Sequence, residues 1–136
     1  MLRHNITRLL HDKRGMSGLI IFAILLPFLG AFLLAVAQMT IIGISQTVVN
    51  NAAFEGARIG AMKGSTTEAR NAANKLGKSI LSNWNTNSKV NASINNGIIT
   101  VTVEYTFPRY SYFKLASINI PTKVQASSSQ QVENRP

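Results

Sequence analysis

Residues 15–54 read GMSGLIIFAILLPFLGAFLLAVAQMTIIGISQTVVNNAAF and contain no charged side chain. This run follows directly after the basic stretch His11-Asp12-Lys13-Arg14. A charged side chain at the centre of a bilayer costs roughly 2.5 to 3.5 kcal/mol on insertion scales, so an uncharged run of this length is compatible with lipid. The run therefore predicts a membrane-inserted helix.

The most apolar part of the run has the length of one membrane span. As an α-helix, residues 16–37 measure about 33 Å, at about 1.5 Å per residue. The hydrocarbon core of a bilayer is about 30 Å thick, so this segment crosses it once. The residues before it hold four basic side chains against Asp12 alone: Arg3, Arg8, Lys13 and Arg14.

These flanking charges predict the orientation and the division of the chain. Lys and Arg next to a membrane segment stay on the cytoplasmic side, so the N-terminus is predicted inside. We expect a basic cytoplasmic leader at 1–15 and a long hydrophobic, transmembrane helix at 16–62. A small extracytoplasmic α+β domain follows at 63–136.

The long helix has one interruption in its apolar part. Pro27 lacks an N–H and clashes with the carbonyl four residues earlier, so a kink is predicted there. Transmembrane helices tolerate proline, so a kink without a functional role remains an alternative. Beyond the membrane the pattern becomes amphipathic, because polar residues alternate with apolar ones at helical spacing: Gln46, Asn50 and Asn51 with Val48, Val49, Ala52 and Ala53.

Composition limits what the outer domain can be. The chain has 136 residues and no cysteine, so no disulfide stabilises a domain of about 70 residues whose core is thin. We expect it to pack on the long helix or on neighbouring subunits. The net charge of +9 comes from scattered basic residues, which favours acidic surface polymers over direct nucleic-acid binding.

A second helix is predicted after the break Lys63-Gly64-Ser65-Thr66. Ser65 or Thr66 provides an N-cap, and the helix is expected to run through about Trp84. An apolar stripe at helical spacing predicts its buried face: Ala69, Ala72, Ala73, Leu76, Ile80 and Leu81.

Three strands are predicted in the rest of the chain. Residues 99–107 give the clearest signal, since apolar and polar residues alternate at every step. The preceding strand alternates in the same way around Val90, Ala92 and Ile94. The connecting Asn95-Asn96-Gly97 is typical of a tight hairpin turn.

A third strand is expected near the C-terminus. Its predicted inner side consists of Ile118, Ile120, Val124 and Ala126. Pro121 implies an edge strand or a bulge. The polar tail from Ser127 to Pro136 is expected to be loose. The predicted fold is therefore α+β: a long helix, a shorter helix and a three-stranded antiparallel sheet.

No combination of residues typical of catalysis is visible. The two histidines, His4 and His11, lie in the leader and lack further ligands. The acids are too dispersed for an acid/base pair: Asp12, Glu55, Glu68, Glu104 and Glu133. We predict no enzymatic activity, no metal site and no cofactor.

Small residues recur every four positions near the end of the long helix: Ala52, Gly56, Gly60 and Gly64. Such a stripe lets another helix approach closely. It predicts helix packing, either against this chain's own sheet and second helix or against a neighbouring subunit. On the same helix Glu55 and Arg58 are three residues apart, which favours a solvated ion pair.

The junction Lys13-Arg14-Gly15-Met16 is a candidate processing site. Basic residues meet glycine just before the apolar run, so a protease at the cytoplasmic membrane surface could remove the leader and leave the helix intact. Ala35-Val36-Ala37 before Gln38 offers the alternative of secretory cleavage. That apolar region is longer than the usual 7–15 residues, however.

Three sequence segments together resemble the TadE/TadG-like minor pilins of tight-adherence type IV pilus systems. They are Arg14-Gly15, the run from Phe22-Ala23 to Pro27, and Asn51-Ala52-Ala53-Phe54-Glu55-Gly56-Ala57-Arg58. The strand from Ile98 to Tyr105, the strand at Ile118 and the Ser/Gln tail fit the same pattern. The resemblance thus covers nearly the whole chain and implies a pilin-like fold.

The resemblance also implies a mode of maturation. A prepilin peptidase would cut after Gly15 and make Met16 the new N-terminus, with Gly18 as an alternative site. The mature chain would join other pilin subunits at an assembly platform in the membrane. Family members usually carry a glutamate just before the Phe-Ala pair, where this chain has Ile21.

Three functions follow as expectations. The first is a minor pilin or pseudopilin with a structural or assembly-priming role in a pilus or secretion pseudopilus. The second is a permanently membrane-anchored binding or accessory module outside the cell. The third is a conventionally secreted small protein. In the first two cases the chain is a single-pass cytoplasmic membrane protein.

Overall fold

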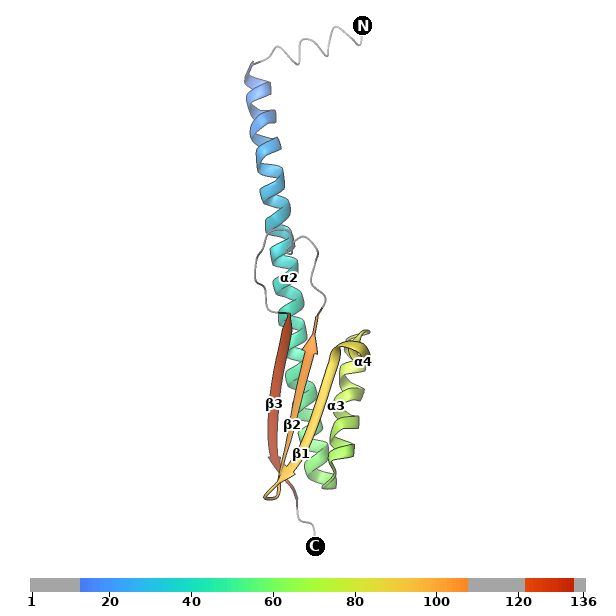
Figure 1. Cartoon of the computed structure of the whole chain (residues 1–136). Helices are drawn as coiled ribbons and strands as arrows, with labels where there is room; N and C mark the ends of the chain where they lie inside the picture. Colours follow the sequence, from blue (N-terminus) through green and yellow to red (C-terminus); the bar gives the residue numbers. More distant parts are fainter. Residues whose placement is uncertain (1–12, 108–121, 134–136) are drawn as a thin grey trace. The chain divides into compact units, whose positions relative to one another are not determined.

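The computed structural model describes residues 13–107 and 122–133, with side chains from residue 15 onward. Within the described residues, three helices precede three strands (Figure 1). The chain divides into two compact units, with the boundary between Met39 and Thr40. The α+β arrangement of a long apolar helix, a second helix and a three-stranded antiparallel sheet confirms the predicted fold class.

The first helix described, α2, spans Lys13–Lys63 and contains Pro27. Its bounds are close to the predicted 16–62. From residue 48 onward its apolar face is buried, as the amphipathic pattern predicted, with Val49 and Ala52 fully covered. The helix ends where Gly64 adopts a positive φ of 62°, a conformation that glycine reaches without steric cost.

The second helix, α3, spans Thr66–Ile80, and Ser65 is its N-cap. The Ser65 hydroxyl accepts a hydrogen bond from the Glu68 N–H, which satisfies one of the free donors of the first turn. The predicted continuation to Trp84 was wrong. Leu81 has extended backbone angles, and Trp84 begins a separate short helix, α4 (Trp84–Asn87).

The predicted apolar stripe of α3 mostly faces the core: Ala69 and Ala73 are buried, and Leu76 and Leu81 are partly buried against it. Ile80 is the exception and is 53% exposed, while Gly77 is also buried. Ile80 is the last residue of the helix. Gly77 was not part of the predicted stripe.

The sheet has the order β1-β2-β3, with both pairs antiparallel. β1 spans Ser88–Asn95 and β2 spans Ile98–Thr106. The predicted hairpin between them is confirmed, because Asn96 and Gly97 both have positive φ, 51° and 75°. Two such residues form the mirror-image turn that matches the twist of paired strands.

The third strand, β3, spans Lys123–Gln131. Ile118, Ile120 and Pro121 lie outside the described residues. The expectation of a loose tail from Ser127 was wrong up to Gln131, because the serines pair with β2. On the outer face Ser129 and Ser127 form side-chain hydrogen bonds with Thr100 and Thr102 at 2.8 and 3.1 Å.

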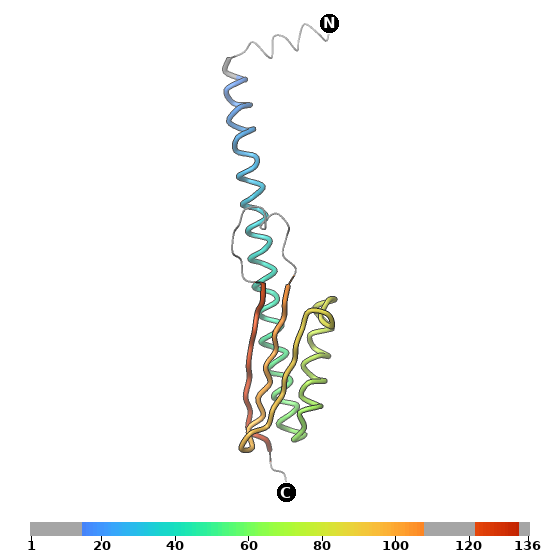
Figure 2. The backbone as a smooth tube through the Cα atoms, in the orientation of Figure 1, coloured from blue at the N-terminus to red at the C-terminus, as the bar shows by residue number. Residues whose placement is uncertain are grey.

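The core of the second unit lies between the sheet and the two helices α2 and α3 (Figure 2). The alternating residues of β2 and the following Phe107 face it, as the sequence predicted: Ile99, Val101, Val103, Tyr105 and Phe107 are all buried. Their neighbours on the other face are polar. α2 contributes small and β-branched residues, which let it approach the sheet closely.

Candidate membrane and assembly segment

The part of α2 in the first compact unit exposes its apolar side chains. Phe28 is 70% exposed and Leu19 is 69% exposed, and no residue of the most apolar stretch is buried. Within the described residues, α2 is the one helix long and apolar enough to cross a membrane. Exposed apolar surface of this extent indicates that lipid or another protein covers it.

The candidate processing residues lie at the start of this segment. A Cβ atom added to Gly15 or Gly18 would meet nothing within 4 Å. Met16, between them, is 42% exposed. Nothing else in the described chain crowds these glycines, and cleavage after Gly15 or Gly18 stays a prediction.

Two further sequence-predicted positions lie in the same segment. α2 continues through Pro27, which leaves the Ala23 carbonyl without its usual helical donor. A kink at Pro27 stays a prediction. Ile21, at the position where the resembling family carries an acid, is 60% exposed.

The small-residue stripe lies in the second unit, against this chain's own elements. Ala52 is fully buried in the core. A Cβ on Gly56 would lie 2.8 Å from the Ala69 carbonyl oxygen, and one on Gly60 would lie 2.6 Å from the Ala69 Cβ. Glycine at both positions therefore lets α3 pack directly on the α2 backbone.

Gly64, the fourth residue of the stripe, has a different position. It ends α2 with its positive φ, and the following Ser65 N–H donates to the Gly60 carbonyl at 3.2 Å. Ala52, Gly56 and Gly60 thus form a packing face of α2, and Gly64 ends the helix. A role for them between subunits stays a prediction.

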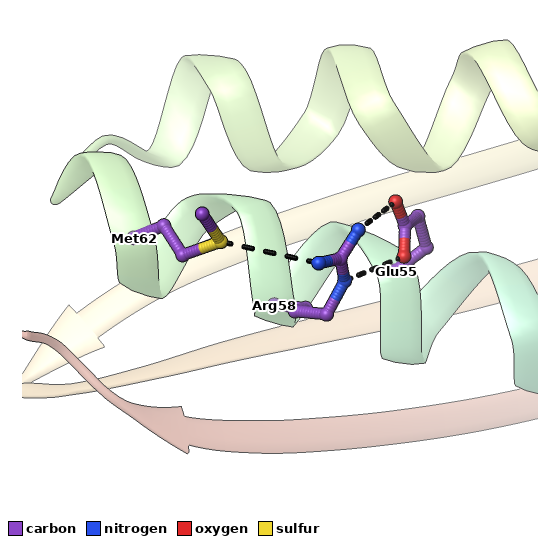
Figure 3. A network of polar contacts seen from close by, with 3 residues as sticks. All are labelled: Glu55, Arg58 and Met62. Atoms are coloured by element: carbon purple, nitrogen blue, oxygen red, sulfur yellow. Dashed lines mark hydrogen bonds and ion pairs between the residues drawn. The ribbon is translucent and has the colours of Figure 1, made fainter.

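Glu55 and Arg58 form the predicted ion pair. Arg58 Nε donates to Glu55 Oε2 at 2.9 Å and Nη2 donates to Oε1 at 2.8 Å, while Nη1 lies 4.0 Å from the Met62 sulfur (Figure 3). The hydrogen bond from Arg58 lowers the pKa of Glu55, the Arg58 charge adds to the effect, and partial burial opposes it. The side chains remain 32% and 47% exposed.

One group of residues was missed by sequence reasoning. Trp84 is fully buried, and its Nε1 donates to Asn74 Oδ1 at 2.9 Å. Its ring stacks on Tyr105 with centroids 5.8 Å apart and packs on Gly77. The sequence feature that could have indicated this contact is Gly77, a lone glycine inside the predicted helix, seven residues before the single tryptophan.

Within residues 13–107 and 122–133 no three side chains of His, Cys, Asp or Glu gather to hold a metal ion. His4 and His11 lie outside these residues. The exposed surface of α2 in the first unit consists mainly of apolar side chains.

An exposed apolar helix that continues into a small helix-and-sheet domain defines a pilin-like protein. A family model described as TadE-like protein matches residues 19–58, which include the run ending at Pro27 and the segment ending at Arg58. This segment is therefore similar to the TadE-like family, which is associated with Tad pilus assembly. No curated protein and no solved structure matches the chain.

Proposed function

We propose that the chain is a minor pilin or pseudopilin of a Tad-like type IV pilus or of a secretion pseudopilus. Its role is structural or assembly-priming, without enzymatic activity. The observation that carries the proposal is the largely exposed apolar helix of residues 16–37, joined to a small α+β domain. The TadE-like match over residues 19–58 supports it.

The exposed helix suggests how such a subunit works. In the membrane, lipid tails cover side chains such as Phe28 and Leu19. The helix leaves lipid only where other apolar helices replace it, and a filament core provides such helices. The missing hydrogen bond at Pro27 makes the helix easier to bend during this transfer.

The proposal includes a topology and partners. The basic residues before the helix place the N-terminus in the cytoplasm and the domain outside. A prepilin peptidase cuts after Gly15, or after Gly18, and the mature chain joins other pilin subunits through the assembly platform. No direct binding of nucleic acid is proposed.

Ile21 favours a second candidate. Where family members carry an acid that pairs with a neighbour's N-terminal amine, this chain has an exposed isoleucine. A permanently anchored extracytoplasmic module needs no such pair. Such a module would keep its leader and remain in the membrane.

The N-terminal sequence of the mature chain, isolated from its source cells, separates these candidates. Met16 or Leu19 as the first residue supports the pilin. An intact Met1 contradicts processing and supports the anchored module. Gln38 as the first residue would remove the membrane helix and contradict both.

A further inference from the structure

Met62 is an exposed methionine near the end of α2, and a cation lies beside its sulfur. The residue is 49% exposed. Arg58 Nη1 is directed at the Met62 sulfur from 4.0 Å (Figure 3). The other methionines, Met1, Met16 and Met39, precede the second compact unit. Met62 is therefore the methionine of the outer domain.

Glu55 holds the guanidinium group of Arg58 in place. Arg58 Nε and Nη2 donate to the two carboxylate oxygens of Glu55 at 2.9 and 2.8 Å. A bidentate arginine–carboxylate pair of this kind fixes the orientation of the planar guanidinium group. The remaining nitrogen, Nη1, thus has a defined position relative to the Met62 sulfur.

The thioether of Met62 makes little use of this donor. A methionine sulfur is a weak hydrogen-bond acceptor. The separation of 4.0 Å also exceeds the length of about 2.7–2.9 Å that a charge-assisted hydrogen bond between nitrogen and oxygen has. An oxygen atom bonded to the sulfur would extend into this gap and accept from Nη1. The surroundings of Met62 therefore suit its sulfoxide better than its thioether.

We propose that Met62 is a site of reversible oxidation and that Arg58 binds the resulting sulfoxide. The oxidant is a peroxide, such as hydrogen peroxide. A sulfur lone pair attacks one peroxide oxygen and forms the S–O bond, while the O–O bond breaks and releases hydroxide. The hydroxide takes the proton of the transferred oxygen and leaves as water, so sulfur loses two electrons. Methionine sulfoxide reductases restore the thioether.

The sulfoxide would extend the ion pair to a network of three residues. Glu55, Arg58 and Met62 are three and four residues apart, so they lie on one face of the last turns of α2. A new hydrogen bond from Arg58 to Met62 stabilises this end of the helix. Sulfoxides in apolar cores have the opposite effect, because a polar oxygen disrupts the packing there. The inference depends neither on the membrane span nor on assembly into a filament.

Melting temperatures of the full chain in detergent, before and after treatment with hydrogen peroxide, test the proposal. Peptide mass spectrometry measures the fraction of Met62 sulfoxide, with free methionine in the same solution as the reference for the rate. Met62 should be oxidised within several-fold of the rate of free methionine, because about half of the residue is exposed. Oxidation should then raise the melting temperature of the wild type by roughly 2–4 °C.

Three variants identify the source of this shift. Met62→Leu is the matched control, because leucine is of similar size, cannot form a sulfoxide and leaves the effects of the other methionines in place. Arg58→Gln removes the donor and should abolish the rise, and Glu55→Gln frees the guanidinium group and should reduce it. Each variant is compared with itself before and after oxidation, so a lower starting stability does not affect the result.

Three results would contradict the proposal. The first is the absence of Met62 sulfoxide under conditions that oxidise free methionine, which would overturn the site itself. The second is a wild-type shift equal to that of Met62→Leu, which would mean that the sulfoxide gains no stabilising partner. The third is an undiminished rise in Arg58→Gln, which would overturn the role of Arg58.

Discussion

The indole ring of Trp84 occupies the space where a side chain at position 77 would begin. Gly77 lies on the buried face of α3, and Trp84 follows the helix by one turn. The ring also stacks on Tyr105 of β2, so it joins α3 to the sheet. Glycine at position 77 is what permits this contact.

Gly77→Ala should lower the free energy of unfolding by about 1–3 kcal/mol relative to Gly43→Ala, because the added methyl group forces Trp84 out of place. Both variants share the gain of about 1 kcal/mol that alanine brings inside a helix, so the comparison isolates the clash. Urea unfolding followed by the fluorescence of Trp84, the single tryptophan, measures it. Gly43→Ala is the matched control, since its Cβ meets nothing within 4 Å. Equal stability of Gly77→Ala and Gly43→Ala would contradict the contact.

Gly60→Leu should destabilise the domain even where no filament forms. Its side chain would collide with Ala69 and Ile99, and overpacking of this kind costs about 1–3 kcal/mol. Thermal unfolding of the monomeric chain in detergent measures the change. If the monomer kept its stability while assembly failed, the glycine would act between subunits instead.

Glu55→Gln should flatten the acid side of the stability profile. Since Arg58 lowers the pKa of Glu55, the pair stabilises the fold above the ordinary value near 4.5, and this contribution disappears as the pH falls through the lower folded-state pKa. Melting temperatures at neutral and strongly acidic pH measure the difference. Arg58→Gln should remove the same difference, and combining both changes should add nothing further. If Glu55→Gln kept the wild-type dependence of melting temperature on pH, that dependence would come from another carboxyl group.

Gly15→Leu should block removal of the leader without affecting the fold, because nothing lies near a Cβ at this position. Intact mass of the chain from its source cells shows whether residues 1–15 remain. Gly18→Leu is the paired variant and separates the two candidate cleavage sites. A normal mature mass in both variants would rule out both glycines.

The sequence predicted those elements whose signal is local. Ser65 caps α3 with its own hydroxyl, and Asn96-Gly97 forms its turn through backbone preference alone. β2 alternates at every residue because one face is buried and the other is polar. These features depend on near neighbours, so the order of residues is sufficient to find them.

The missed features depend on contacts between distant residues. Ser127 and Ser129 have no apolar pattern, and they join a strand because Thr102 and Thr100 lie opposite. After the end of α3 the chain turns so that Trp84 packs on Gly77. Helix propensities describe single residues and could not predict this contact. For the small-residue stripe, spacing alone could not distinguish a contact within the chain from one between chains.

The largely apolar surface of residues 16–37 has a thermodynamic consequence for the proposed function. Lipid tails are as apolar as leucine side chains, so moving such a helix from lipid to a bundle of similar helices changes little hydrophobic free energy. The transfer is then an exchange between nearly equivalent solvents. The direction of the transfer would depend on contacts made by the outer domain or on work done by the assembly machinery. Without those contacts or that work, the same helix could return to lipid.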